Sequence, residues 1–268
     1  MIGEIRKEVA DAVDSCLAKI AKEDYLSFVL FIGRGDIIPG LNPQVGTDCV
    51  MDYQLDRYHD ETRENFYIRY LNRNYSKEGF HYQGESGIDD LSIEMMIYAH
   101  LWDSHYFLKS LYRLACILKG KGYQWNATIP EQKKHEFVVE EIITPLKENW
   151  APLGKILEIG YNSDIRNAFA HALYNVNVES EEIFTWTRLG SRVYKFADFQ
   201  KIFLYSVTLM NILQNAMESN HDAACMKNTA LTEVFKTPEG LDVQVYGKQF
   251  EHCGRLFSEF NLVKVSKE

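Results

Sequence analysis

The chain has 268 residues, 46% of them hydrophobic and 13% aromatic, which is enough apolar side chain for one large domain or two modest ones. Lys and Arg number 29 against 38 Asp and Glu, so the formal charge is -9. This acidic balance disfavours a protein that coats duplex nucleic acid with a broad basic surface. Any contact with nucleic acid is therefore expected to be local.

The five cysteines are an odd number without a Cys-x-x-Cys pair, and this pattern predicts neither a disulfide framework nor a zinc site. Residues 1–10 carry charges where a signal peptide is apolar. The longest apolar run, 26–32, is too short to span a bilayer. We therefore expect a cytoplasmic protein that uses no metal, no cofactor and no membrane.

The first half of the chain alternates helical patterns with segments rich in glycine. Apolar residues recur three and four apart over 3–22, which predicts a first helix. Closely spaced glycine and proline predict a loop at 33–48, and a helix is expected over 61–71. The strongest helical pattern covers 89–119, where Asp89 or Asp90 is the expected cap.

The second half combines two hydrophobic periods. Apolar residues follow the helical period over 136–159, and Pro145 and Pro152 predict a kink or break there. Asn162 or Ser163 is expected to cap another helix. Beyond it, alternation of apolar and polar residues predicts short strands at 174–178, 183–187 and 193–196, a long helix at 197–218 and a second hairpin from 231–235 and 241–246.

One polar cluster has a chemical rationale, and it consists of Arg166, Asn167 and His171. Asn167 and His171 are four residues apart and so share a helix face, whereas Arg166 lies about 140° around from His171. The long arginine side chain must therefore reach into the same space. An imidazole can exchange a proton near neutral pH, and a guanidinium can stabilise phosphate oxygens with two parallel hydrogen bonds. These residue types suit phosphoryl transfer.

The string from Arg166 to His171 resembles the Arg-Asn-x-x-x-His motif of the HEPN family. The context is also similar, because a motif helix is followed by a short hairpin and a final amphipathic helix. The resemblance implies an all-α fold, a HEPN-like helical bundle with small β-hairpin insertions. The helical domain would cover 1–220, with its motif core at about 89–218, and 221–268 would form a C-terminal appendage, expected to be a hairpin.

The resemblance implies a metal-independent endoribonuclease. Two motif helices would face each other across a homodimer, where a ribose 2′-hydroxyl of the RNA attacks the adjacent phosphate. His171 would be the general base or acid, Arg166 would stabilise the pentavalent phosphate, and Asn167 would orient the cluster or the RNA. The catalytic candidates are therefore Arg166, Asn167 and His171.

Relatives of this kind often act as toxins or in antiviral defence. This implies an antitoxin or a nucleotidyltransferase as a further partner. In a subset of the family the nucleotidyltransferase modifies the tyrosine of a His-x-Tyr motif. Here Tyr174 stands three residues after His171, so the sequence departs from that pattern.

Other interpretations stay open. A noncatalytic module could use the same helix face to bind a partner protein, a nucleotide or RNA. The motif could also be accidental, with Arg166 paired to Asp164 or Glu158 and His171 bonded to Asn167.

A second candidate pair lies on the helix predicted over 89–119. His100 and Asp103 are three residues apart, so they could orient each other or line the same cleft as the motif. A solvated pair at the edge of the core is the simpler explanation.

Overall fold

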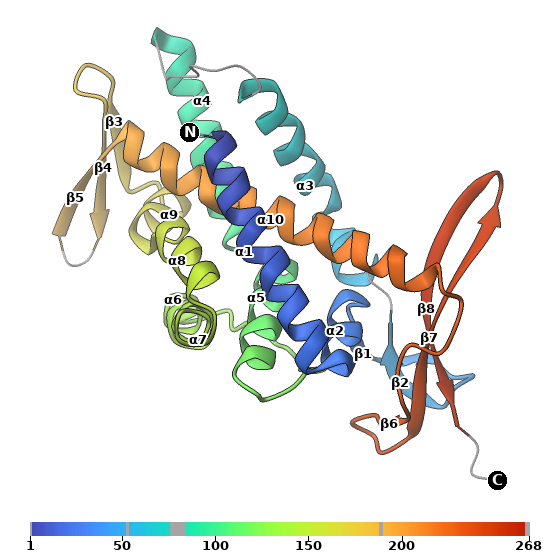
Figure 1. The fold of residues 1–268 in the computed structure, drawn as a ribbon. Helices are drawn as coiled ribbons and strands as arrows, with labels where there is room; N and C mark the ends of the chain where they lie inside the picture. The colour runs from blue at the N-terminus through green and yellow to red at the C-terminus, as the bar shows by residue number, and fades with distance from the viewer. Residues whose placement is uncertain (1, 52–53, 76–83, 188–189, 266–268) are drawn as a thin grey trace.

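The structure, a computed structural model, centres on a long helix, α10 (Phe196–Cys225), that crosses the molecule. The first helix, α1 (Ile2–Glu23), packs along α10, and small sheets lie toward the two ends of this helical body (Figure 1). Strands therefore cover both ends of a helical bundle. The structure describes residues 2–51, 54–75, 84–187 and 190–265.

The helices of the first half follow the predicted apolar spacing. The face of α1 that carries Val9, Val13 and Leu17 is buried, so the helix expected over 3–22 is confirmed. Asp24 caps the next helix by accepting a hydrogen bond from the Ser27 amide at 3.0 Å. The remaining bounds are α2 (Tyr25–Ile32), α3 (Gln54–Asn74), α4 (Gly84–Leu101) and α5 (His105–Leu118).

The helix predicted over 89–119 is divided in two. The chain leaves helical geometry after Leu101, and Ser104 then caps α5 by accepting a hydrogen bond from the Phe107 amide at 3.1 Å. The division places Asp103 in the loop between α4 and α5. That position gives its carboxylate access to elements that a straight helix would not reach.

The stretch expected to be helical over 136–159 is also divided, as the prolines predict. Pro152 stands in the first turn of a new helix, where the amide that proline lacks would have no helical partner, and Pro145 stands where a π-helix passes directly into another α-helix. Trp150, with φ of -150° and ψ of 74°, leaves helical geometry between those helices. The bounds are α6 (Lys134–Phe137), the π-helix η1 (Val138–Ile143), α7 (Thr144–Asn149), α8 (Ala151–Gly160) and α9 (Ser163–Ala170).

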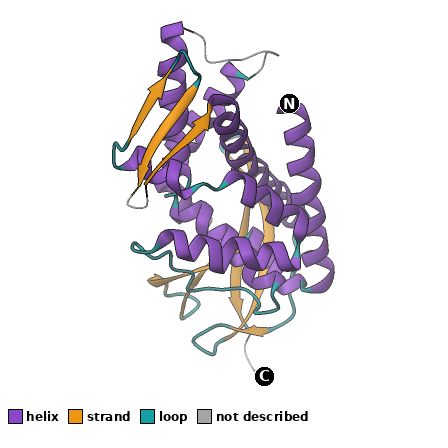
Figure 2. Cartoon of the chain, turned by 90° about the vertical axis from the view of Figure 1, so that its left-hand side faces the viewer, coloured by secondary structure: helices purple, strands orange, loops and turns teal. Residues whose placement is uncertain are grey.

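The strands predicted after the motif helix form an antiparallel sheet in the order β3–β4–β5. Ile183 and Thr185 of the central strand are buried, whereas Trp186 is exposed, so the period of two separates an inner from an outer face. In Figure 2 this sheet stands apart from the strands near the C-terminus. The bounds are β3 (Tyr174–Asn177), β4 (Glu182–Thr187) and β5 (Gly190–Lys195).

The prediction of an all-α fold is wrong, because the described residues combine helices with three small antiparallel sheets. The loop expected at 33–48 contains a hairpin, β1 (Asp36–Asn42) and β2 (Thr47–Val50). The C-terminal hairpin also extends further than its pattern predicted. A third strand, β8 (Arg255–Lys264), joins β6 (Phe235–Lys236) and β7 (Asp242–His252).

The C-terminal strands share the core of the helices. Val243 and Val245 of β7 are fully buried in the same hydrophobic cluster as the helices, and α10 itself continues to Cys225. The proposed division into 1–220 and 221–268 stays a prediction.

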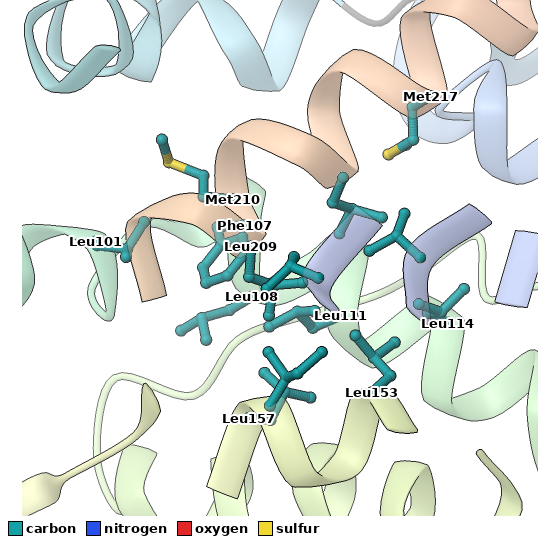
Figure 3. Close-up of a cluster of buried hydrophobic side chains, with 14 of the residues drawn as sticks. Leu101, Phe107, Leu108, Leu111, Leu114, Leu153, Leu157, Leu209, Met210 and Met217 are labelled. Atoms are coloured by element: carbon teal, nitrogen blue, oxygen red, sulfur yellow. The ribbon is translucent and has the colours of Figure 1, made fainter. Parts of the chain in front are cut away.

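Part of the core is a cluster of buried side chains from α5, α8 and α10 (Figure 3). Burial of these side chains is the main favourable term in the stability of the bundle. The core also fixes α8, the helix that leads directly into the motif helix α9. The labelled side chains are Leu101, Phe107, Leu108, Leu111, Leu114, Leu153, Leu157, Leu209, Met210 and Met217.

Candidate functional site

The motif helix α9 begins at a strong cap. The Asn162 side chain accepts hydrogen bonds from the amides of Asp164 and Ile165, both at 3.1 Å. Ile165 and Ala168 then face the core and are buried. Phe169 packs against the edge of the core, and the polar side chains of Asp164, Arg166 and Asn167 are partly exposed. Of the two caps that the sequence offered, Asn162 is the one used.

Tyr98 of α4 fixes the turn between α8 and α9. Its buried hydroxyl accepts a hydrogen bond from the Asn162 amide at 2.6 Å and donates to the Gly160 carbonyl at 3.0 Å. Burial raises the pKa of Tyr98, so the hydroxyl stays neutral and able to donate. The start of the motif helix is thereby tied to the helix that precedes Asp103.

Arg166 is held by two neighbouring groups. Its guanidinium donates to the Asn167 side-chain oxygen at 2.7 Å and forms an ion pair with the Asp103 carboxylate. Lys134 at the start of α6 donates to the same carboxylate at 2.8 Å. The cluster therefore joins the α4–α5 loop, α6 and α9, and its two cations exceed its one carboxylate.

The Asp103 carboxylate stays ionised inside this cluster. Burial opposes the charged form, but hydrogen bonds from Lys134 and Arg166 outweigh that cost and hold the pKa of Asp103 below its usual range. The Asp103 side chain is 35% exposed and that of Arg166 21% exposed, so solvent and a ligand can reach the cluster. A phosphate would meet a guanidinium whose orientation is already set.

His171 lies at the exposed end of the same helix. The helix ends at Ala170, and His171 is its C-terminal cap, with its amide donating to the Asn167 carbonyl at 3.0 Å. Ala172 then adopts a left-handed conformation with a φ of 53°, which turns the chain into β3. The His171 imidazole makes no hydrogen bond to any side chain in the part of the chain that the structure describes.

The structure thus brings Arg166 and Asn167 together and leaves His171 apart from them. A rise of about 1.5 Å per residue separates Arg166 and His171 by roughly 7.5 Å along the helix. One chain therefore presents the guanidinium and the imidazole as two separate functional groups at different points along this segment.

Arg166 and His171 do not make the contacts that were expected if the motif were accidental. Asp164 pairs with Arg192 at 2.6 Å, and Glu158 pairs with Lys147 at 2.7 Å, so neither carboxylate holds Arg166. Among the described residues, the His171 imidazole makes no hydrogen bond to the Asn167 side chain, whose oxygen accepts from Arg166. The structure therefore does not contain the specific contacts that the interpretation of an accidental motif predicted.

Sequence reasoning also missed part of the cluster. Asp103 was considered as a partner of His100, but it binds Arg166 and Lys134, and His100 is exposed. Lys134 carries no motif, and its part depends on a contact between residues 31 positions apart in the chain. The sequence shows which residues are cations and which are carboxylates, but it does not show which of them form pairs.

A pocket of about 360 Å³ adjoins the start of the motif helix. Its lining includes His135, Tyr161, Asp164 and Arg192, and the rings of His135 and Tyr161 stack with their centroids 5.8 Å apart. Burial raises the pKa of Tyr161 to about 12, so its hydroxyl is neutral at physiological pH. The pocket offers aromatic and charged groups within reach of the cluster around Arg166.

Comparisons of this chain with family models, with curated proteins and with solved structures find no match. Among residues 2–51, 54–75, 84–187 and 190–265, no helix is long and apolar enough to cross a bilayer. Over the same described residues, no three His, Cys, Asp or Glu side chains gather where they could hold a metal ion.

The ion pair of Asp103 makes the stability of the protein depend on pH. A carboxylate with a lowered pKa in the folded state stabilises that state above its unfolded pKa of about 3.9, and the contribution is lost as pH falls through the folded pKa. We expect Asp103→Asn to unfold at lower urea concentration than the wild type at pH 7. The difference should shrink as the pH falls below about 4.

Urea unfolding followed by circular dichroism between pH 3 and 7 measures this difference. Asp14→Asn on the exposed face of α1 is the matched control and should show neither effect. A difference between Asp103→Asn and the wild type that stayed constant over the whole range would mean that the ion pairs of Asp103 do not stabilise the fold.

Proposed function

We propose that this protein cleaves RNA without a metal ion, at a site formed where the motif helices of two copies meet. The observation that carries the proposal is the arrangement on α9. The Arg166 guanidinium is oriented by Asp103 and Asn167, and an exposed imidazole stands at the end of the same short helix. The resemblance of this segment to the HEPN motif supports the same chemistry.

In the proposed reaction the 2′-oxygen of a ribose forms a bond to the adjacent phosphorus, and the bond from phosphorus to the 5′-oxygen breaks. The proton of the 2′-hydroxyl passes to one imidazole, and the departing 5′-oxygen takes a proton from another imidazolium. The Arg166 guanidinium stabilises the charge on the pentavalent phosphate. Asn167 orients the guanidinium through its side-chain oxygen.

This chemistry favours a dimer, because it uses one proton acceptor and one proton donor. One copy of the chain has one histidine in the motif, His171, so two copies would supply both the proton acceptor and the proton donor. In the resulting homodimer the two α9 helices would face each other with Arg166 from each side near the scissile phosphate.

An exposed apolar strip beside His171 supports this assembly. Leu173, Trp186 and Val193 are 46%, 45% and 51% exposed. The Trp186 amide donates to the Leu173 carbonyl at 3.0 Å, and Val193 pairs with Phe184, so these side chains share the outer face of the sheet β3–β5. An apolar strip of this kind is typical of a surface that another protein covers.

The family resemblance also leads us to propose a cellular substrate and a biological role. RNA in the cytoplasm is the proposed substrate. A role as a toxin or in antiviral defence is proposed, with an antitoxin or a nucleotidyltransferase as the regulator of the site. The spacing between His171 and Tyr174 differs from the modified motif, so that tyrosine is not proposed as the target.

The direct test is cleavage of labelled single-stranded RNA by purified protein in EDTA. Loss of a general acid or base lowers a rate by about 10²- to 10⁴-fold, and we expect that loss for His171→Ala. His252→Ala, an exposed histidine at the end of β7, is the matched control and should cleave like the wild type. Cleavage that persisted in His171→Ala, or that required an added metal, would overturn the mechanism.

The same experiment distinguishes the proposed ribonuclease from a noncatalytic binding module. A binding module would produce no RNA fragments in any variant, whereas Arg166→Ala would still weaken RNA association. Fragments from the wild type and none from Arg166→Ala support the catalytic proposal.

The strip beside His171 generates a separate prediction about assembly. We expect the wild type to sediment at twice the chain mass of 31.1 kDa and Trp186→Asp to sediment as a monomer, because a buried charge without a partner opposes association. Leu256→Asp, which changes an exposed leucine on β8, is the matched control and should leave the dimer intact. A wild type that is monomeric at micromolar concentration would contradict the proposed dimer.

A further inference from the structure

The pocket of about 360 Å³ at the start of the motif helix contains a stacked pair of rings. The planes of His135 and Tyr161 differ by 20°, and His135 Nδ1 lies 3.3 Å from the Tyr161 hydroxyl oxygen. Buried Trp102 packs edge-on against the Tyr161 ring, with the centroids 4.7 Å apart. The pair is therefore held in place from the core, while His135 itself is exposed.

One wall of the pocket is apolar. Val139 and Ile143 line it, and both belong to the π-helix η1. A single turn of π-helix inside an α-helical segment occurs frequently at functional sites. An apolar wall beside a pair of aromatic rings suits the flat ring of a nucleobase better than a bare ion.

The pocket also has a polar side, formed by Asp164 and Arg192. Their ion pair is 2.6 Å long, and the side chains are 19% and 64% exposed. Such an exposed pair contributes little to stability, so either group can also bind a ligand. Arg192 stands opposite buried Thr185 in the sheet, on the face away from Trp186 and Val193. The pocket therefore stays open when the proposed dimer strip is covered.

The pocket adjoins the cluster around Arg166. Lys134, which donates to the Asp103 carboxylate, directly precedes His135 in α6. Burial raises the pKa of Tyr161, and the charges of Arg166 and Asp103 act on the same hydroxyl. A ligand that stacks in the pocket would therefore extend toward the guanidinium of Arg166.

We propose that this pocket binds one unpaired guanine base of an RNA strand, beside the phosphate that Arg166 contacts. The inference rests on the proposed function, since it adds a base to the substrate of that site. Unpaired bases stack on aromatic side chains, including histidine, and are recognised through hydrogen bonds at their edges.

Guanine is the base that matches the polar side of the pocket best. Its N1 and its exocyclic N2 are adjacent donors, which one carboxylate can accept together, and its O6 and N7 are acceptors for a guanidinium. Asp164 and Arg192 supply this carboxylate and this guanidinium next to each other. Uracil offers a carboxylate only one such donor.

Fluorescence anisotropy in EDTA tests the proposal with two labelled RNAs that carry 2′-methoxy groups, so that binding is measured without cleavage. One probe is a short oligouridine, and the other has a single guanine within the same run. The guanine probe is expected to bind the wild type about tenfold more tightly.

Two variants test the stacking ring and the carboxylate separately. His135→Ala should weaken binding of the guanine probe about tenfold, whereas the matched control His252→Ala should not. Asp164→Asn should bind the two probes almost equally, because an amide oxygen is a single acceptor beside a donor. Asp14→Asn, on the exposed face of α1, should keep the preference for guanine. Circular dichroism verifies that each variant is folded.

The proposal is overturned if the folded wild type binds the two probes equally or binds neither. Unchanged binding by His135→Ala, or a preference for guanine that survives in Asp164→Asn, has the same meaning. Cleavage of ordinary RNA without any preference for guanine would refute the pocket alone. A preference for guanine without cleavage would support the pocket and refute the ribonuclease.

Discussion

The candidate site depends on the Asp103 carboxylate and its two cations. Asp103 binds Lys134, 31 residues later in the chain, and Arg166, 63 residues later. A guanidinium and an ammonium this close would repel each other without the carboxylate. The interaction therefore fixes the motif helix relative to the α4–α5 loop and α6, and it orients the group that would meet a phosphate.

The parts of the fold that follow from local spacing could be predicted from the sequence. The period of α1, the Asn162 cap of α9 and the alternation over β3–β5 each depend on residues a few positions apart. The division between α4 and α5 was not predicted, because the apolar period continues across Ser104 and hides its capping role. The same division explains why the role of Asp103 was missed.

The sheets also include a part that could not be predicted from local sequence. Glycine and proline at 33–48 predicted a loop, yet the segment pairs as a hairpin that is held from outside. The Glu239 carboxylate accepts hydrogen bonds from the Thr47 hydroxyl at 3.1 Å and the Asp48 amide at 3.2 Å, about 190 residues away. Desolvation opposes the charged form of Glu239, but hydrogen bonds from Thr237, from its own backbone amide, from Cys49 and from Thr47 outweigh that cost and lower the pKa of Glu239 to about 2. Such long-range contacts leave no pattern in the local sequence. The all-α fold was expected from the resemblance of the segment at 166–171 to the HEPN motif, and six residues do not determine the fold of the rest of the chain.

The central claim is that Arg166 and His171 promote attack by a ribose 2′-hydroxyl, and the chemistry of the product ends tests it most directly. Cleavage of RNA in EDTA should leave a 2′,3′-cyclic phosphate on one fragment and a 5′-hydroxyl on the other. An otherwise identical RNA with 2′-methoxy groups should stay intact. Fragments ending in a 3′-hydroxyl and a 5′-phosphate, or cleavage of the methoxy substrate, would contradict this account.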